Sequence, residues 1–176
     1  AGDRVRIGEL SDDPESDHQD AETWPADPSA RPFRVVRGPQ VDRFDAEAWN
    51  AFVGQPFTVD AQSNRMGLRL NGSPIVPESA DLISEGVVTG DVQVTGSGQP
   101  IVLLPGRATI GGYPKIATVI EADHDRLGQL RPGATIRFAE VSLGASLAFL
   151  LRDAHNAGKL VLSDPDEPEK GSGWIV

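Results

Sequence analysis

VQVTGSGQPIVLL, residues 92–104, contains two short runs of strand-forming residues, 92–94 and 101–104, on either side of a glycine-rich turn. Similar runs occur at 33–37, 57–59, 66–70, 116–120 and 135–138. The many glycines (19) and prolines (14) between these runs indicate tight turns. About seven or more short strands without long crossover helices predict a mainly β fold, either a β-barrel or a β-sandwich.

Three short helices are expected beside the strands. Asp45 is expected to cap the first helix, and Gly54 is expected to end it in a left-handed conformation. The second is expected at 124–130, with Asp123 as its cap and 131–133 as its stop. The third, at about 143–157, places apolar residues on one stripe: Leu143, Leu147, Leu150, Leu151 and Ala154.

With 176 residues, the chain is long enough for one domain with one core. We expect a first strand at 1–8, an acidic mobile loop at 9–31, and the barrel core at 32–142. A C-terminal helix (143–158) and a tail (159–176) follow. The loop is expected to be mobile because it has too few apolar residues to offset the entropy cost of ordering its backbone.

Composition excludes several function classes. The net charge of −10 and the lack of basic runs argue against a nucleic-acid partner, because such partners are bound through phosphate neutralisation. No apolar stretch approaches the roughly 20 residues needed to span a bilayer, and no signal segment opens the sequence. We therefore expect a cytoplasmic protein without a membrane partner.

Metal and nucleotide signatures are not found in the sequence. Cysteine is absent, and the three histidines (His18, His124 and His155) are scattered, so no metal site is expected. The pattern G-x-x-x-x-G-K-[S/T] does not occur, so this chain is not expected to bind ATP through a P-loop.

Two clusters of polar residues are candidates for an anion site. In SNRMGLRL (63–70), a strand would place Arg65 and Arg69 on one face, where two guanidinium groups could clamp a carboxylate or a carboxyphosphate. In GSGQP (96–100), Ser97 could form an anion nest and Gln99 could pair with an amide-like substrate. The alternatives are a solvated strand face for the first cluster and an ordinary hairpin turn for the second.

A third cluster, RATIGGYPK (107–115), follows its paired glycines with a polar aromatic residue and a cation. Tyr113 could donate a hydrogen bond to a ligand carbonyl, and Lys115 or Arg107 could neutralise developing negative charge. The alternative is a tyrosine that fills the mouth of a barrel and bonds to the backbone.

Together these motifs resemble the biotin-dependent carboxyltransferase-like family. Its members include the C subunit of 5-oxoprolinase (also called allophanate hydrolase subunit 2), the regulator KipA, and the carboxyltransferase region of urea carboxylase. The resemblance covers about 33–142 and rests on motifs that occur in the family's order: SNRMG (63–67), SEGVV (84–88), QV (93–94), GQP (98–100) and GGYPKIA (111–117).

The resemblance implies a cyclophilin-like β-barrel and membership of an ATP-dependent complex that opens 5-oxoproline to glutamate. The implied partners are a KipI-type protein, which is the B subunit of 5-oxoprolinase, together with the A subunit. ATP would act at the level of the complex. One alternative is a non-catalytic, KipA-like regulator that binds the KipI-type partner. The other is a carboxyltransferase module, which would use biotin.

Within the catalytic hypothesis, the chemistry of the three clusters suggests roles for individual residues. Lys115, Tyr113 and Arg107 are the catalytic candidates, and the substrate-binding candidates are Arg65, Arg69, Gln99, Ser97 and Glu85. The family commonly reads DRQTTGGYP where this chain reads GRATIGGYP (106–114), so an acid and a glutamine are missing from that loop. Only the second half of a typical member is matched, so we expect this piece to be inactive alone.

Overall fold

The computed structural model describes residues 27–79 and 82–156 of the 176. The strand expected at 1–8, the tail expected at 159–176 and most of the loop expected at 9–31 lie outside the described residues. In the described part, no helix is both long enough and apolar enough to cross a bilayer.

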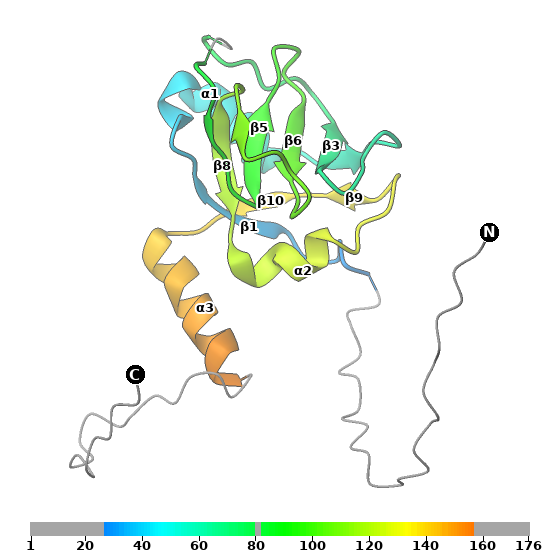
Figure 1. Ribbon diagram of the computed structural model, residues 1–176, viewed down its shortest axis with the longest axis vertical. Coiled ribbons are helices and arrows are strands. Elements are labelled where there is room, and N and C mark those ends of the chain that lie inside the picture. Colours follow the sequence, from blue (N-terminus) through cyan, green and yellow to red (C-terminus); the bar gives the residue numbers. More distant parts are fainter. Residues whose placement is uncertain (1–26, 80–81, 157–176) are drawn as a thin grey trace, which may run out of the picture.

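Eight strands form one sheet in the order β10-β1-β8-β5-β6-β3-β2-β9 (Figure 1). Their bounds are β1 Phe33–Arg37, β2 Phe57–Val59, β3 Gly67–Asn71, β5 Asp91–Val94, β6 Pro100–Leu103, β8 Lys115–Val119, β9 Thr135–Ile136 and β10 Phe138–Glu140. Neighbouring strands are antiparallel except for the parallel pair β1–β10. A separate antiparallel ribbon consists of β4 (Glu85–Gly86) and β7 (Ile110–Gly111).

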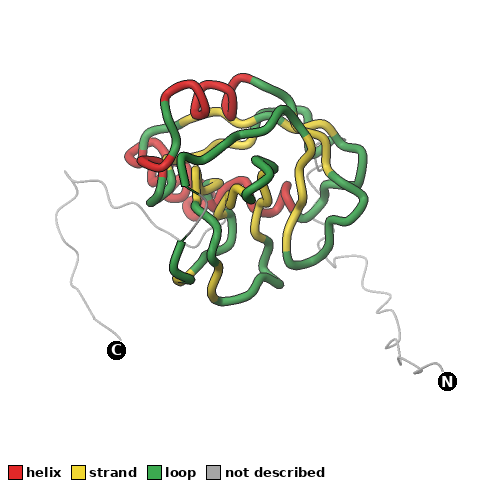
Figure 2. The backbone as a smooth tube through the Cα atoms, turned by 90° about the horizontal axis from the view of Figure 1, so that it is seen from above, coloured by secondary structure: helices red, strands yellow, loops and turns green. Residues whose placement is uncertain are grey.

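The sheet curls because its two edge strands are consecutive in the sequence. Only Arg137 separates β9 from β10, yet these strands lie at opposite ends of the strand order. The carbonyl of Arg137 accepts a hydrogen bond from the Phe33 amide of β1 at 2.8 Å. The result is a nearly closed barrel, and the view from above shows the chain bending around into a ring (Figure 2). The prediction of a mainly β, barrel-like fold with three short α-helices is confirmed.

Helix α1 (Ala46–Gly54) follows a short 3₁₀ turn, η1 (Val41–Arg43), and buries Trp49 and Phe52. Phe52 stacks on Phe138 of β10 with 4.6 Å between ring centroids. The Asp45 carboxylate caps the helix by accepting a hydrogen bond from the Ala48 amide at 2.7 Å, as predicted. Gly54 is the last helical residue, but its φ is not positive, so the predicted left-handed stop is wrong there.

Helix α2 (His124–Leu127) is shorter than the predicted 124–130, because a 3₁₀ turn, η2 (Glu121–Asp123), precedes it and the helix ends early. Asp123 makes no capping hydrogen bond, so its predicted role is wrong. Its buried carboxylate instead accepts hydrogen bonds from Arg34 at 2.7 Å and from Arg126 at 3.2 Å. Burial by itself would raise the pKa of Asp123, but the hydrogen bonds from Arg34 bring it below its usual value.

Helix α3 (Leu143–Asn156) extends away from the barrel below α2 (Figure 1). The Arg34 guanidinium lies 4.1 Å from the centre of the Phe149 ring and connects the helix to β1. The leucine stripe of α3 is exposed, with 55% of Leu147 accessible to solvent. These leucines therefore contribute nothing to the barrel core.

Candidate functional site

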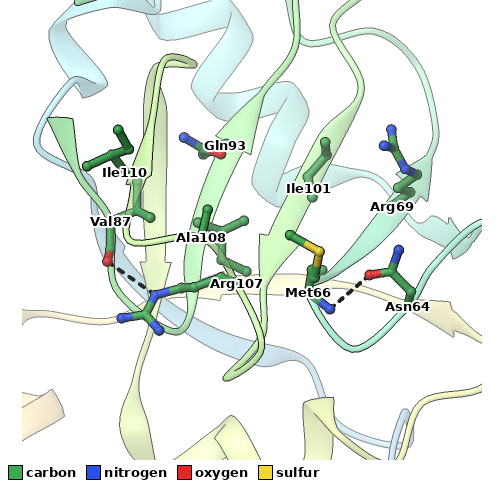
Figure 3. Close-up of a pocket in the computed structure, with 11 residues that line it drawn as sticks. Asn64, Met66, Arg69, Val87, Gln93, Ile101, Arg107, Ala108 and Ile110 are labelled. Carbon is green, nitrogen blue, oxygen red and sulfur yellow. Dashed lines mark hydrogen bonds between the residues drawn. The ribbon is translucent and has the colours of Figure 1, made fainter. Parts of the chain in front are cut away.

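A cavity of about 230 Å³ lies between the outer face of the barrel and the β4–β7 ribbon (Figure 3). We call it the ribbon cavity. The barrel contributes Gly67, Arg69, Gln93, Ile101 and Leu103. The ribbon and its flanking loops contribute Val87, Arg107, Ala108 and Ile110. Two arginines, one from each wall, therefore face a partly apolar space.

The register of the sheet places four side chains in one row on the outer face. Arg69 of β3 pairs with Ile101 of β6, Ile101 pairs with Gln93 of β5, and Gln93 pairs with Lys115 of β8. Directly paired residues project to the same side of a sheet, and neighbouring strands are about 4.8 Å apart. Arg69 and Gln93 are therefore held roughly 10 Å apart at the backbone, with Ile101 as an apolar floor between them.

The two cavity arginines have donors that no described residue uses. Arg107 donates from Nε to the Val87 carbonyl at 3.1 Å, and within 27–79 and 82–156 its two terminal nitrogens make no hydrogen bond (Figure 3). The Arg69 guanidinium makes no hydrogen bond to any described residue either. Both cations can therefore bind an anion without breaking a bond inside the protein.

Gln93 lies under the ribbon and is only 6% exposed. Its Nε2 donates to the Tyr113 carbonyl at 3.2 Å. The ribbon comes so close that a Cβ at Gly111 would lie 2.5 Å from Gln93 Nε2, so a larger residue there would have to displace the Gln93 side chain. Gln93 was not among the site residues predicted from the sequence. The alternation of strand 92–94 marks it as outward-facing, but only the tertiary position of the ribbon shows that it is covered.

Lys115 and Glu85, both predicted to be functional, form an ion pair with each other. Lys115 is 4% exposed, and its Nζ also donates to the Gly86 carbonyl at 3.2 Å. The hydrogen bond from Lys115 holds the pKa of Glu85 below its usual value. The pair fastens the ribbon to the barrel, and neither residue lines the ribbon cavity.

Ser97, Gln99 and Tyr113 lie outside the cavity lining as well. The Ser97 hydroxyl lies 2.9 Å from the Thr95 hydroxyl inside the hairpin turn, where Gly98 has a φ of +79°. The Gln99 side chain accepts from the Gly72 amide and donates to the Gly72 carbonyl. Tyr113 is exposed and meets the site through its backbone carbonyl. The geometry at 95–99 matches the hairpin alternative.

Arg65 does not share a face with Arg69, so that prediction is wrong. The chain turns tightly between Asn64 and Gly67, where the Gly67 amide donates to the Asn64 carbonyl at 3.1 Å, and β3 begins only at Gly67. Arg65 lines a second cavity of about 190 Å³ beside Leu104. Met66, the next residue, is exposed and lines the ribbon cavity.

Comparisons with known proteins agree with this architecture. The family model described as "Carboxyltransferase domain, subdomain A and B" matches residues 1–140. The C subunit of 5-oxoprolinase from Escherichia coli (strain K12) is 44% identical over 117 residues, which cover 65% of this chain and 37% of that protein. This chain therefore spans much less than half of that relative.

Two solved structures are similar to the barrel. The crystal structure of TTHA0988 shares 39% identity with a TM-score of 0.53, covering 63% of this chain and 21% of that one. The urea amidolyase of K. lactis shares 26% identity with a TM-score of 0.65, covering 74% of this chain and 9% of that one.

Proposed function

The chain belongs to the carboxyltransferase domain, subdomain A and B, family, and from this membership we propose that it acts as part of a 5-oxoprolinase-type complex. The relatives named as C subunits of 5-oxoprolinase support this assignment. In the proposed reaction, 5-oxoproline is opened to glutamate. The lactam C–N bond breaks, hydroxide adds to the carbonyl carbon, and the nitrogen gains a proton.

The observation that carries the proposal is the charge of the ribbon cavity. In a chain with a net charge of −10, the cavity is lined by Arg69 and Arg107 and by no carboxylate among the described residues. The substrate of the proposed reaction is a small anion with a carboxylate and a lactam. Guanidinium groups recognise carboxylates through paired hydrogen bonds, and the neutral amide of Gln93 suits the lactam end.

The cavity arginines are also suited to the chemistry. Phosphorylation of the lactam oxygen by ATP would create a good leaving group and add negative charge at the reacting carbon. A well-placed donor aimed at such charge contributes about 3 kcal/mol of transition-state stabilisation. In the proposal, the KipI-type protein and the A subunit of the complex complete the site and supply ATP binding. Lys115, through Glu85, holds the ribbon in place above the cavity.

A second candidate is carboxyl transfer, and the structural similarity to urea amidolyase favours it. The same two arginines would then bind a carboxyl group carried on biotin. Only in this alternative is biotin a cofactor.

The test is to co-produce the chain with the KipI-type protein and the A subunit, and to measure ATP-dependent glutamate formation from 5-oxoproline. We expect the Arg69→Ala, Arg107→Ala double variant to lose about 100-fold in kcat/KM, because two charged hydrogen bonds are removed. Arg65→Ala is the matched control, since Arg65 lies beside the other cavity. Full activity in the double variant would contradict the proposal. A stable complex without turnover would support a KipA-like regulator.

A further inference from the structure

Gln93 is a buried polar residue that lies between two valines of β5. Its neighbours Val92 and Val94 are completely buried in the barrel core, so alternation along β5 turns Gln93 to the outer face. There it lies among the residues of the ribbon cavity, between Ile110 and Ile101 in the close-up (Figure 3). An amide placed in such a position needs partners for both its ends.

One end of this amide is fixed by the protein. Nε2 donates to the Tyr113 carbonyl, a group that can only accept hydrogen bonds. A flipped amide would set two carbonyl oxygens against each other, so the partner determines the orientation. Oε1 is therefore the atom of this amide that remains for a ligand.

The other end is open to the cavity. Oε1 makes no hydrogen bond to any described residue. Among the same residues, every side-chain nitrogen or oxygen that is shut off from solvent has a partner. Oε1 is therefore not sealed inside the protein. The lining of the ribbon cavity therefore includes one fixed hydrogen-bond acceptor, Gln93 Oε1, together with the cationic side chains of Arg69 and Arg107.

We propose that Gln93 is a specificity-determining residue, whose Oε1 accepts a hydrogen bond from an amide N–H of the ligand. The site then selects small carboxylates that also carry an amide with an N–H, and whose short apolar part lies over Ile101. This inference rests on the proposed function of the ribbon cavity. It adds that the ring nitrogen must bear a hydrogen, a requirement that the two arginines alone do not impose.

Replacing the ligand N–H with oxygen gives a direct test. The lactone analogue of 5-oxoproline keeps the carboxylate and the ring but sets an oxygen where the N–H was. A buried acceptor facing an ether-like oxygen loses its hydrogen bond, so we expect the wild-type chain to bind the lactam at least about 10-fold more tightly than the lactone. Dissociation constants for each compound are measured by calorimetry on the chain co-produced with the KipI-type protein and the A subunit.

Two glutamine variants separate a ligand contact from a general packing effect. Gln93→Met keeps the length of the side chain and removes the acceptor, so the lactam-to-lactone preference should fall to below about 3-fold. Gln99→Met is the matched control, because the Gln99 amide is bonded to Gly72 outside the cavity. It should keep the wild-type preference. A Gln93→Met variant that keeps the wild-type preference would overturn the inference.

The outcomes also distinguish this inference from the function on which it rests. Equal affinity for lactam and lactone in the wild-type chain, with both weakened by Arg69→Ala, would overturn the role of Gln93 and leave the anion site in place. No binding of either compound would overturn the proposed function itself. Because the wild-type comparison needs no variant, it stands even if Gln93→Met does not fold.

Discussion

Two groups of arginines in this barrel differ in what surrounds them. At the α2 end, Arg126 is buried and donates to Asp123 and to the carbonyls of Pro28 and Arg31, while Arg34 binds both oxygens of Asp123. At the ribbon cavity, Arg69 and the terminal nitrogens of Arg107 make no hydrogen bond to the described residues.

The difference shows which charges serve the fold and which are available to a ligand. A buried guanidinium whose hydrogens are matched by protein acceptors stabilises the native state only as part of its cluster. A guanidinium with unused donors beside a cavity contributes little to folding and can bind an anion at low cost. We call the first group the Asp123 cluster and compare it below with the ribbon cavity.

The largest effect on stability is expected from the Asp123 cluster. Asp123→Ala removes a fully buried carboxylate that faces two cations, so the free energy of unfolding should fall by about 3 kcal/mol. Urea denaturation followed by fluorescence measures this loss. Asp125→Ala, at an exposed position two residues further along in α2, should change stability by less than about 0.5 kcal/mol. Equal losses in the two variants would remove the distinction between the two groups of arginines.

The opposite pattern is expected for the ribbon cavity. The Arg69→Ala, Arg107→Ala variant should unfold within about 1 kcal/mol of wild type, because each site is at least partly exposed. Its affinity for 5-oxoproline should nevertheless fall about 100-fold, as measured by calorimetry. A large loss of stability with unchanged affinity would reverse the assignment of the two regions.

A smaller effect is expected from the ion pair that fastens the ribbon. Because the hydrogen bond from Lys115 lowers the pKa of folded Glu85, this pair contributes stability above the unfolded glutamate pKa of about 4.3. That contribution is lost as the pH falls through the lower, folded pKa. NMR titration of the Glu85 carboxyl should give a pKa below the ordinary value, and Lys115→Met should raise it. An unchanged pKa in Lys115→Met would show that the pair does not form.

The smallest effect is expected from an arginine that belongs to neither group. Arg65→Ala should change the free energy of unfolding by less than about 0.5 kcal/mol, because Arg65 is exposed in a turn. It should also change the affinity for 5-oxoproline by less than about 2-fold, since Arg65 lies beside the second cavity. A loss similar to that of Arg69→Ala would show that the ligand binds elsewhere.

The strands could be predicted from the sequence because their signals are local. The alternation of apolar residues at 33–37, 57–59 and 92–94 can be read from residues that are adjacent in the sequence. The same is true of the helix cap at Asp45. Many short strands and few helices left a barrel and a sandwich both open, and only the resemblance to the carboxyltransferase-like family favoured the barrel.

Several features of the site depend on residues that are distant in the sequence. Asp123 looks like a helix cap until Arg34, 89 residues away, is seen to bind it. Gln93 looks like an ordinary outward-facing residue until the ribbon is placed over it. Arg65 is separated from Arg69 by the turn between Asn64 and Gly67. Because of this turn, β3 begins one residue later than predicted, and Arg65 does not follow the alternation of the strand.

Whether the ribbon cavity is an anion and amide site can be seen in a crystal structure of the chain, assembled with its proposed partner subunits, with 5-oxoproline bound. We expect the ligand carboxylate at Arg69 and Arg107 and the ring N–H within hydrogen-bond distance of Gln93 Oε1. Electron density for the ligand beside Arg65 in the second cavity, or an empty ribbon cavity at saturating 5-oxoproline, would contradict it.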